Sequence, residues 1–194
     1  MMICCLTAMF IISCLGNDDD NNKQITPAEA KACMQTMRGV YTGKLYYLHT
    51  NDTNQVTSTD SLNAGWIVND SLVIINNYPT KALAEHVTNA SMKAALLNAV
   101  SQPLICEVGI TNTSPIEFLV NPRPMKFKLN YDGEDHEIAI VYYVNSIRSF
   151  GIYNRDRDIL EIMVCIGGIY VDDKLVYNLS SGVNNLFSSS SHTK

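Results

Sequence analysis

The sequence contains little that would suggest nucleic-acid binding, a metal site or a catalytic centre. Its 14 basic residues are scattered and its net charge is −5, so the chain offers no basic stripe for phosphate groups. Its 4 histidines stand alone, with no spacing that brings two onto one face for zinc. A G-x-S-x-G elbow and a phosphate-cradling glycine loop are absent. We therefore predict no nucleic-acid partner, no metal, no cofactor and no enzyme activity.

An uncharged apolar segment runs from Met1 to Ile12. Its length suits the core of a signal peptide, because a membrane-spanning helix needs roughly 20 apolar residues. The triplet Ile12-Ser13-Cys14 resembles the end of a bacterial lipobox, which implies a signal peptide over residues 1–13 and lipid attachment at Cys14. A basic residue is missing before it, so a start upstream of Met1 stays open. The alternative interpretation is a buried strand with an incidental cysteine.

The stretch after Cys14 is polar and acidic. The lipobox resemblance implies a diacylglyceryl group and a further acyl chain such as palmitate on Cys14, and more than one chain gives a stable anchor. Residues 14–25 then form a lipidated, flexible linker, which stays disordered because it has almost nothing to bury. Its ten residues 15–24 reach about 33 Å when extended. The triplet Asp18-Asp19-Asp20 resembles the export signal of Bacteroidales lipoproteins, which implies surface exposure on the outer membrane. A plain spacer, facing the periplasm, is the alternative.

One globular domain over residues 26–187 accounts for most of the chain, and a Ser-rich tail over 188–194 is expected to be disordered. The hydrophobic content of 46% supplies a core. After processing, three cysteines remain among apolar neighbours, where free cysteine behaves as a small buried hydrophobe: Cys33, Cys106 and Cys165. One disulfide among them stays open as an alternative.

A helix signal opens this domain. Thr26 suits the N-cap, Pro27 suits the first helical position, and Glu29 completes a capping box. Apolar residues then recur at helical spacing until Gly39 ends the pattern.

Strand patterns follow. Residues 40–50 and 55–62 predict a hairpin with Tyr41, Leu45 and Tyr47 on one face. Shorter apolar runs occupy 65–68 and 71–76. Beyond Pro79 the period changes, and short helices are expected near 83–87 and over 92–100, packed as a lid on the sheet.

The second half of the chain reads as successive strands with short connections. The expected strands are 104–110, 116–120, 126–131, 138–144, 160–171 and 175–179. Asp132-Gly133 is a hairpin turn, and Gly167-Gly168 suggests a bulge or a close backbone approach. The predicted fold is α+β: mainly antiparallel β, as a sandwich or open barrel, with one N-terminal helix and an inserted helix pair.

This order of features resembles a known family. The resemblance rests on the capped helix, on Gly39 to Leu45, on Trp66-Ile67, on Leu72 to Pro79 and on the helix from Met92 to Leu97. The family is a DUF4840-like group of small Bacteroides lipoproteins, known only as a domain of unknown function. The resemblance implies a fold and a location, and it transfers no catalytic residue.

The strongest acidic cluster could still serve a hydrolase. It consists of Asp132, Glu134, Asp135, His136 and Glu137. It lies beside a predicted hairpin turn, where such charges are usually just solvated. The segment 154–158 imitates the start of a calcium loop, but Ile159 replaces the required glycine and Cys165 the required glutamate.

Three functions follow from these features. The preferred one is a non-catalytic surface module that binds a glycan or another envelope protein, with tyrosines such as Tyr46-Tyr47 and Tyr142-Tyr143 available for stacking or for the core. A lipocalin-like small-molecule carrier is the alternative, which an enclosed pocket would support and a filled interior would contradict. A hydrolase is third. Asp60-Ser61-Leu62 and Asp70-Ser71-Leu72 also resemble bacterial O-glycosylation sites near predicted turns, so Ser61 and Ser71 are candidate sites.

Overall fold

The computed structural model describes residues 24–50 and 56–194. Within them, three short helices accompany one antiparallel sheet of ten strands. The helices are α1 (Pro27–Met37), α2 (Lys81–Ala84) and α3 (Ala90–Asn98). The strands are β1 (Gly39–Thr50), β2 (Val56–Val68), β3 (Leu72–Tyr78), β4 (Gln102–Thr113), β5 (Ile116–Pro122), β6 (Met125–Tyr131), β7 (Glu134–Tyr142), β8 (Phe150–Asn154), β9 (Ile159–Val171) and β10 (Lys174–Thr193).

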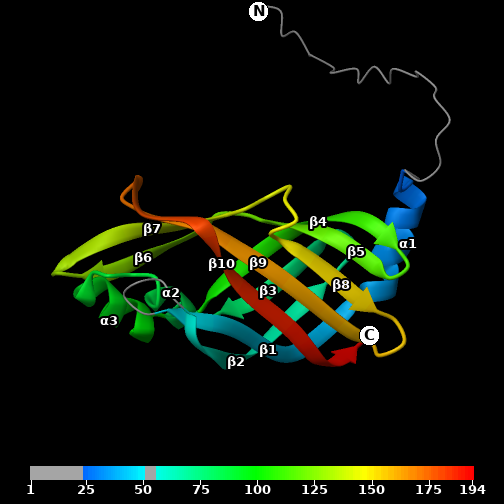
Figure 1. The fold of residues 1–194 in the computed structure, drawn as a ribbon, viewed down its shortest axis with the longest axis horizontal. Coiled ribbons are helices and arrows are strands. Elements are labelled where there is room, and N and C mark those ends of the chain that lie inside the picture. The colour runs from blue at the N-terminus through cyan, green and yellow to red at the C-terminus, as the bar shows by residue number, and fades with distance from the viewer. Residues whose placement is uncertain (1–23, 51–55) are drawn as a thin grey trace, which may run out of the picture.

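The sheet closes into a barrel. The hydrogen-bonded order is β10-β1-β2-β3-β4-β5-β8-β9, and β10 also pairs with β9, which completes a ring of eight strands. The other edge of β9 pairs first with β8 and then with β7, so the β6–β7 hairpin continues beyond the ring. Antiparallel β structure is confirmed, and closure replaces the expected sandwich or open barrel. Figure 1 shows the hairpin extending from one end.

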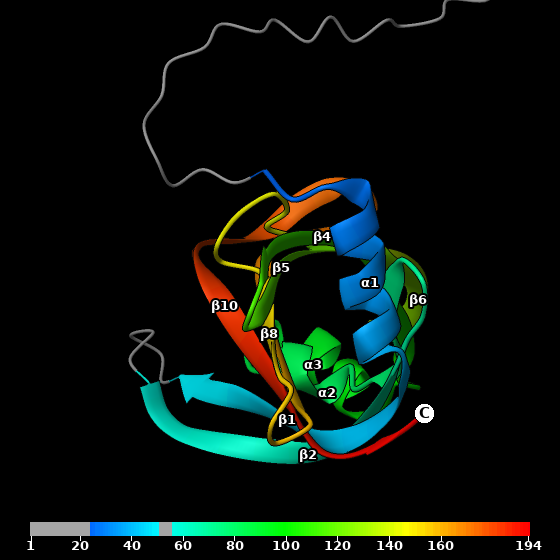
Figure 2. The ribbon, with the colours of Figure 1, turned by 90° about the vertical axis from the view of Figure 1, so that its right-hand side faces the viewer.

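Helices cover the two ends of the barrel (Figures 1 and 2). α1 begins with the predicted capping box between Thr26 and Glu29, and it buries Cys33, Met34 and Met37. Viewed along the barrel in Figure 2, α1 crosses the near end, and α2 and α3 lie at the far end. The helix pair therefore packs at the end of a barrel rather than over a flat sheet. Among the described residues, no helix is both long and apolar enough to span a membrane.

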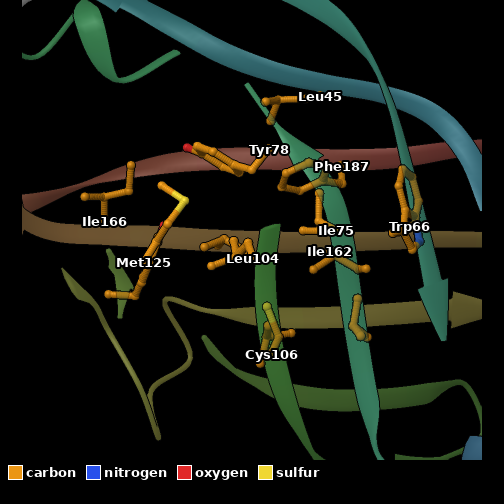
Figure 3. Packing of buried hydrophobic residues seen from close by; sticks show 14 of the residues in the cluster. Leu45, Trp66, Ile75, Tyr78, Leu104, Cys106, Met125, Ile162, Ile166 and Phe187 are labelled. Carbon is orange, nitrogen blue, oxygen red and sulfur yellow. The ribbon is translucent and has the colours of Figure 1, made fainter. Parts of the chain in front are cut away.

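The strands bury the faces that their alternation predicts. Tyr41, Leu45 and Tyr47 point inward from β1, while Val40 and Tyr46 on the other face are exposed. The interior is lined by large side chains, several of which Figure 3 shows packed together. The largest fully buried ones include Trp66, Tyr41, Tyr78, Phe118 and Phe187.

The expected glycine bulge in β9 is also present. The pairing with β7 shifts at Gly167, because Val141 is opposite Gly168 and Tyr142 is opposite Ile166. A Cβ at Gly168 would lie 3.1 Å from the Tyr177 carbonyl oxygen, so the backbone approach is close as well.

Three element predictions were wrong in detail. β2 runs unbroken to Val68, so the separate strand expected at 65–68 is its final part. α3 ends at Asn98 and the backbone becomes extended at Ala99, which leaves Val100 80% exposed outside the helical period. β7 ends at Tyr142, so Val144, expected inward, is exposed in the following loop.

The Ser-rich C-terminus was expected to be disordered, and this prediction was wrong. Residues 188–193 form the last part of β10 and pair with the start of β1, where Val40 is opposite Thr193. Ser189 is buried, and its Oγ accepts a hydrogen bond from the Leu160 N–H at 2.8 Å. The polar residues are ordered because they satisfy the backbone of two neighbouring strands.

Ring closure leaves no room for a side chain at Gly151 in β8, because a Cβ there would overlap the Phe118 ring. Gly151→Ala should therefore destabilise the protein by about 1–3 kcal/mol through overpacking, measured by urea unfolding. Gly109→Ala in β4 is the matched control, since no atom lies within 4 Å of the position of its Cβ. Equal stability of the two variants would contradict the packing described here.

Candidate functional site

The acidic cluster expected to serve a hydrolase is dispersed along the β6–β7 hairpin. Asp132 and Gly133 both have positive φ, 53° and 85°, as a tight hairpin turn requires. The Asp135 carboxylate accepts a hydrogen bond from Asn130 Nδ2 at 2.7 Å, and Glu137 Oε1 lies 3.5 Å from Lys126 Nζ. These carboxylates are exposed and bonded to strand neighbours, so they do not converge on a substrate position.

The histidine of this cluster also has a structural contact. His136 Nδ1 lies 2.7 Å from Asp172 Oδ2, and its ring stacks on Tyr131 with centroids 4.1 Å apart. Asp172 Oδ1 accepts from the Glu137 N–H at 2.9 Å. These two hydrogen bonds, that of His136 first, lower the pKa of Asp172. These contacts therefore hold the β9–β10 turn against the β6–β7 hairpin.

A similar group lies at the α1 end of the barrel. Asp158 is the last residue of the segment 154–158 that imitates a calcium loop, and it accepts a hydrogen bond from the Tyr153 hydroxyl at 2.6 Å. His192 Nδ1 lies 2.7 Å from the same carboxylate, and its Nε2 lies 3.1 Å from the Arg38 carbonyl oxygen. The His192 side chain is buried and stacks on Tyr41. Both ring nitrogens face acceptors, so neither is available as a catalytic base.

A metal site and a cysteine nucleophile have equally little support. Among residues 24–50 and 56–194, no group of three His, Cys, Asp or Glu side chains could hold a metal ion. Cys33, Cys106 and Cys165 are free and buried, as predicted, and form no disulfide with one another. Burial raises the pKa of Cys106 to about 12, so its nucleophilic thiolate is disfavoured.

The predicted modification sites fall in different surroundings. Cys14 lies outside the described residues. Ser71 is exposed in the turn between β2 and β3, where its N–H donates to Asn69 Oδ1 at 3.1 Å. Ser61 lies within β2, opposite Tyr46, and is half-buried, so the expectation of a turn is met at Ser71 and not at Ser61.

The outer wall of the barrel carries an open groove. It has a volume of about 460 Å³ and lies between β5, β8 and the loop 143–149. Its lining is mostly apolar and comprises Thr111, Glu117, Phe118, Leu119, Ile147, Phe150, Gly151 and Ile152. Its volume lies within the range of ligand sites, and its apolar lining is typical of them.

The loop that borders this groove is held in place. Arg148 lies over the Tyr143 ring, 4.6 Å from its centroid, and both side chains donate to the Ser180 carbonyl. Asn145 N–H donates to Asn121 Oδ1 at 2.6 Å. Ile147, within this loop, is nevertheless 85% exposed. The sequence analysis missed Ile147, although an isolated isoleucine among polar loop residues was an available signal.

The barrel interior contains the remaining candidate, a set of polar side chains without partners. Tyr78 and Tyr142 are buried with unbonded hydroxyls, and Asn185 is buried with neither amide atom bonded. Tyr46 is exposed and Tyr142 is in the core, so the tyrosine pairs divide between surface and interior. Asn185 was not identified from the sequence because its neighbours do not show the alternation of polar and apolar residues that indicates a strand.

Comparisons with known proteins add a family and no activity. A family model described as "Domain of unknown function (DUF4840)" matches residues 36–171, from the end of α1 to the end of β9. No curated protein and no solved structure matches the chain.

The Asp158 group predicts a pH dependence. The bonds from Tyr153 and His192 lower the folded-state pKa of Asp158, so its stabilisation is complete above the unfolded-state pKa of about 4. It disappears as the pH falls through the folded-state value. Asp158→Asn should cost about 1 kcal/mol at pH 7, allowing for a half-exposed carboxylate.

Thermal unfolding of both proteins from pH 7 to pH 2 measures this effect. The difference between wild type and Asp158→Asn should shrink in acid. Asp156→Asn, an exposed neighbour in the same turn, is the matched control and should behave as wild type. A difference that is constant with pH would show that the carboxylate charge is not involved.

Proposed function

This chain belongs to the family described as Domain of unknown function (DUF4840), and we propose that it is a lipid-anchored cell-envelope protein that acts as a non-catalytic binding module. The anchor is the lipidated Cys14, after removal of residues 1–13. The acidic linker that follows favours the outer face of the outer membrane over a periplasm-facing position. The domain then lies within a linker length of the membrane surface.

The observation that carries the binding role is the open groove between β5, β8 and the loop 143–149. An apolar groove of about 460 Å³ is within the range of ligand sites and leaves apolar surface in water. Ile147 on its border is 85% exposed and adds to the apolar surface of the groove. The fixed loop means that little ordering is required on binding.

The chemistry of the groove favours an apolar protein segment over a glycan. A sugar presents many hydroxyl groups that need polar partners, and the lining offers Thr111 and Glu117. Leu119, Phe150 and Ile152 suit the aliphatic or aromatic side chains of another envelope protein. A hydrolase has the least support, because the acidic cluster is bonded within its own hairpin.

The anchor is tested by Cys14→Ala. The variant should move from the detergent phase to the aqueous phase on phase partitioning and keep the melting temperature of wild type, because the described domain supplies its own caps and core. Cys5→Ala, within the proposed signal peptide, is the matched control and should stay in the detergent phase. Protease treatment of intact cells then separates surface exposure from a periplasm-facing position. A Cys14→Ala protein that remains in the detergent phase would disprove the anchor.

The groove is tested by photo-crosslinking in intact cells of the native host. A photoreactive residue at position 147 should give a discrete protein adduct that Leu119→Asp reduces at least several-fold, because Leu119 lines the groove. The control is the same residue at position 100, since Val100 is also strongly exposed but follows α3 and is not part of the groove. Equal adducts at both positions, or adducts with lipid alone, would contradict binding of a protein in the groove.

A further inference from the structure

Among the described residues, three uncharged polar side chains in one part of the barrel interior have no hydrogen-bond partner. They are Tyr78, Tyr142 and Asn185, and each is at least nine-tenths buried. The Trp66 indole N–H is also buried without a partner, whereas Thr80 donates to the Leu96 carbonyl and Ser189 accepts from the Leu160 N–H. Asn185 therefore stands out, because both its amide nitrogen and its amide oxygen are unbonded.

The three side chains belong to one region of the interior, around Ile166 of β9. Tyr142 is opposite Ile166 in the β7–β9 pairing. Asn185 is opposite Val164, two residues before Ile166 on the same buried face of β9. Figure 3 shows the Tyr78 hydroxyl directed toward Ile166 and Met125. Burial, and to a lesser extent the neighbouring Tyr78 and Cys106, raise the pKa of the Tyr142 hydroxyl.

The surroundings of this region are apolar and carry no charge. Ile166, Met125 and Leu104 lie beside it in Figure 3, and all three are buried. Among the described residues, the buried polar residues Thr80, Ser149, Asn185 and Ser189 carry no charge, and the buried His192 side chain bonds Asp158 at the α1 end of the barrel. A charged ligand bound in this region would lack an oppositely charged partner.

An unbonded polar group in a dry interior destabilises the folded state, and Asn185 alone leaves two polar atoms unbonded. Such groups are tolerated when something else bonds them. An eight-stranded barrel is wide enough to be filled by its side chains or to hold one small ligand.

We propose that the barrel interior around Tyr78, Tyr142 and Asn185 binds one small uncharged molecule that combines an apolar body with a hydrogen-bond donor and an acceptor. The Asn185 amide supplies the complementary acceptor and donor, and the two tyrosine hydroxyls bond further polar atoms. The aliphatic side chains of Ile166, Met125 and Leu104 contact the apolar body. This site is separate from the outer groove, so the two proposals fail independently.

Benzamide is a suitable probe, because it is uncharged and carries an amide on an apolar ring. Titration should give a saturable change in the fluorescence of Trp66, the only tryptophan, whose ring contacts Phe187 two residues from Asn185. It should also raise the melting temperature by about 2 °C or more at saturation. Benzoate, of the same shape but charged, should do neither.

Substitutions test whether benzamide binds in this region of the interior. Asn185→Leu should weaken benzamide binding at least tenfold, whereas Asn184→Leu, an exposed neighbour on the opposite face of β10, should leave it unchanged. Tyr142→Phe removes one oxygen atom and serves if Asn185→Leu does not fold. Absence of saturation by benzamide overturns the proposal, and so does binding that survives Asn185→Leu. A higher melting temperature of Asn185→Leu and Tyr142→Phe than of wild type would overturn it too, because it would indicate a dry interior.

Discussion

The pairing of β10 with both β1 and β9 is the constraint on which the barrel depends. It joins the first and last strands of the chain, and it turns an open sheet with two exposed edges into a ring. Everything else takes its position from that ring. α1, with α2 and α3, covers its ends, the loop 143–149 stands on its outer wall, and Asn185 is brought into its interior.

Local patterns in the sequence predicted most of the elements because each depends on neighbouring residues, but they did not predict β8. The Thr26 capping box, the inward face of β1 and the Asp132-Gly133 turn follow from spacing and backbone preference. Closure could not be predicted in this way. The serines that complete β10 have no apolar alternation, and they are ordered by hydrogen bonds to strands about 150 and 25 residues earlier in the chain.

The candidate sites also divide into features that local sequence patterns indicate and features that depend on long-range contacts. Acidic and histidine-containing motifs attract attention in a sequence, yet His136 and His192 each stack on a tyrosine and bond an aspartate at a turn. Asp158 and Asp172 both have positive φ, so these pairs hold strained turns in place. The groove and the interior polar groups are formed by residues that are far apart in sequence, so no local sequence motif predicts them.

Closure by the final strand has a consequence for how the chain acquires its fold. One edge of β1, and the part of β9 that faces β10, lack a partner until β10 is available, and β10 contacts β1 across most of the length of the chain. Such topologies fold slowly and expose unpaired edges while they do so. During synthesis the barrel can therefore close only after β10 has left the ribosome, so the nascent chain stays unclosed until that strand is available.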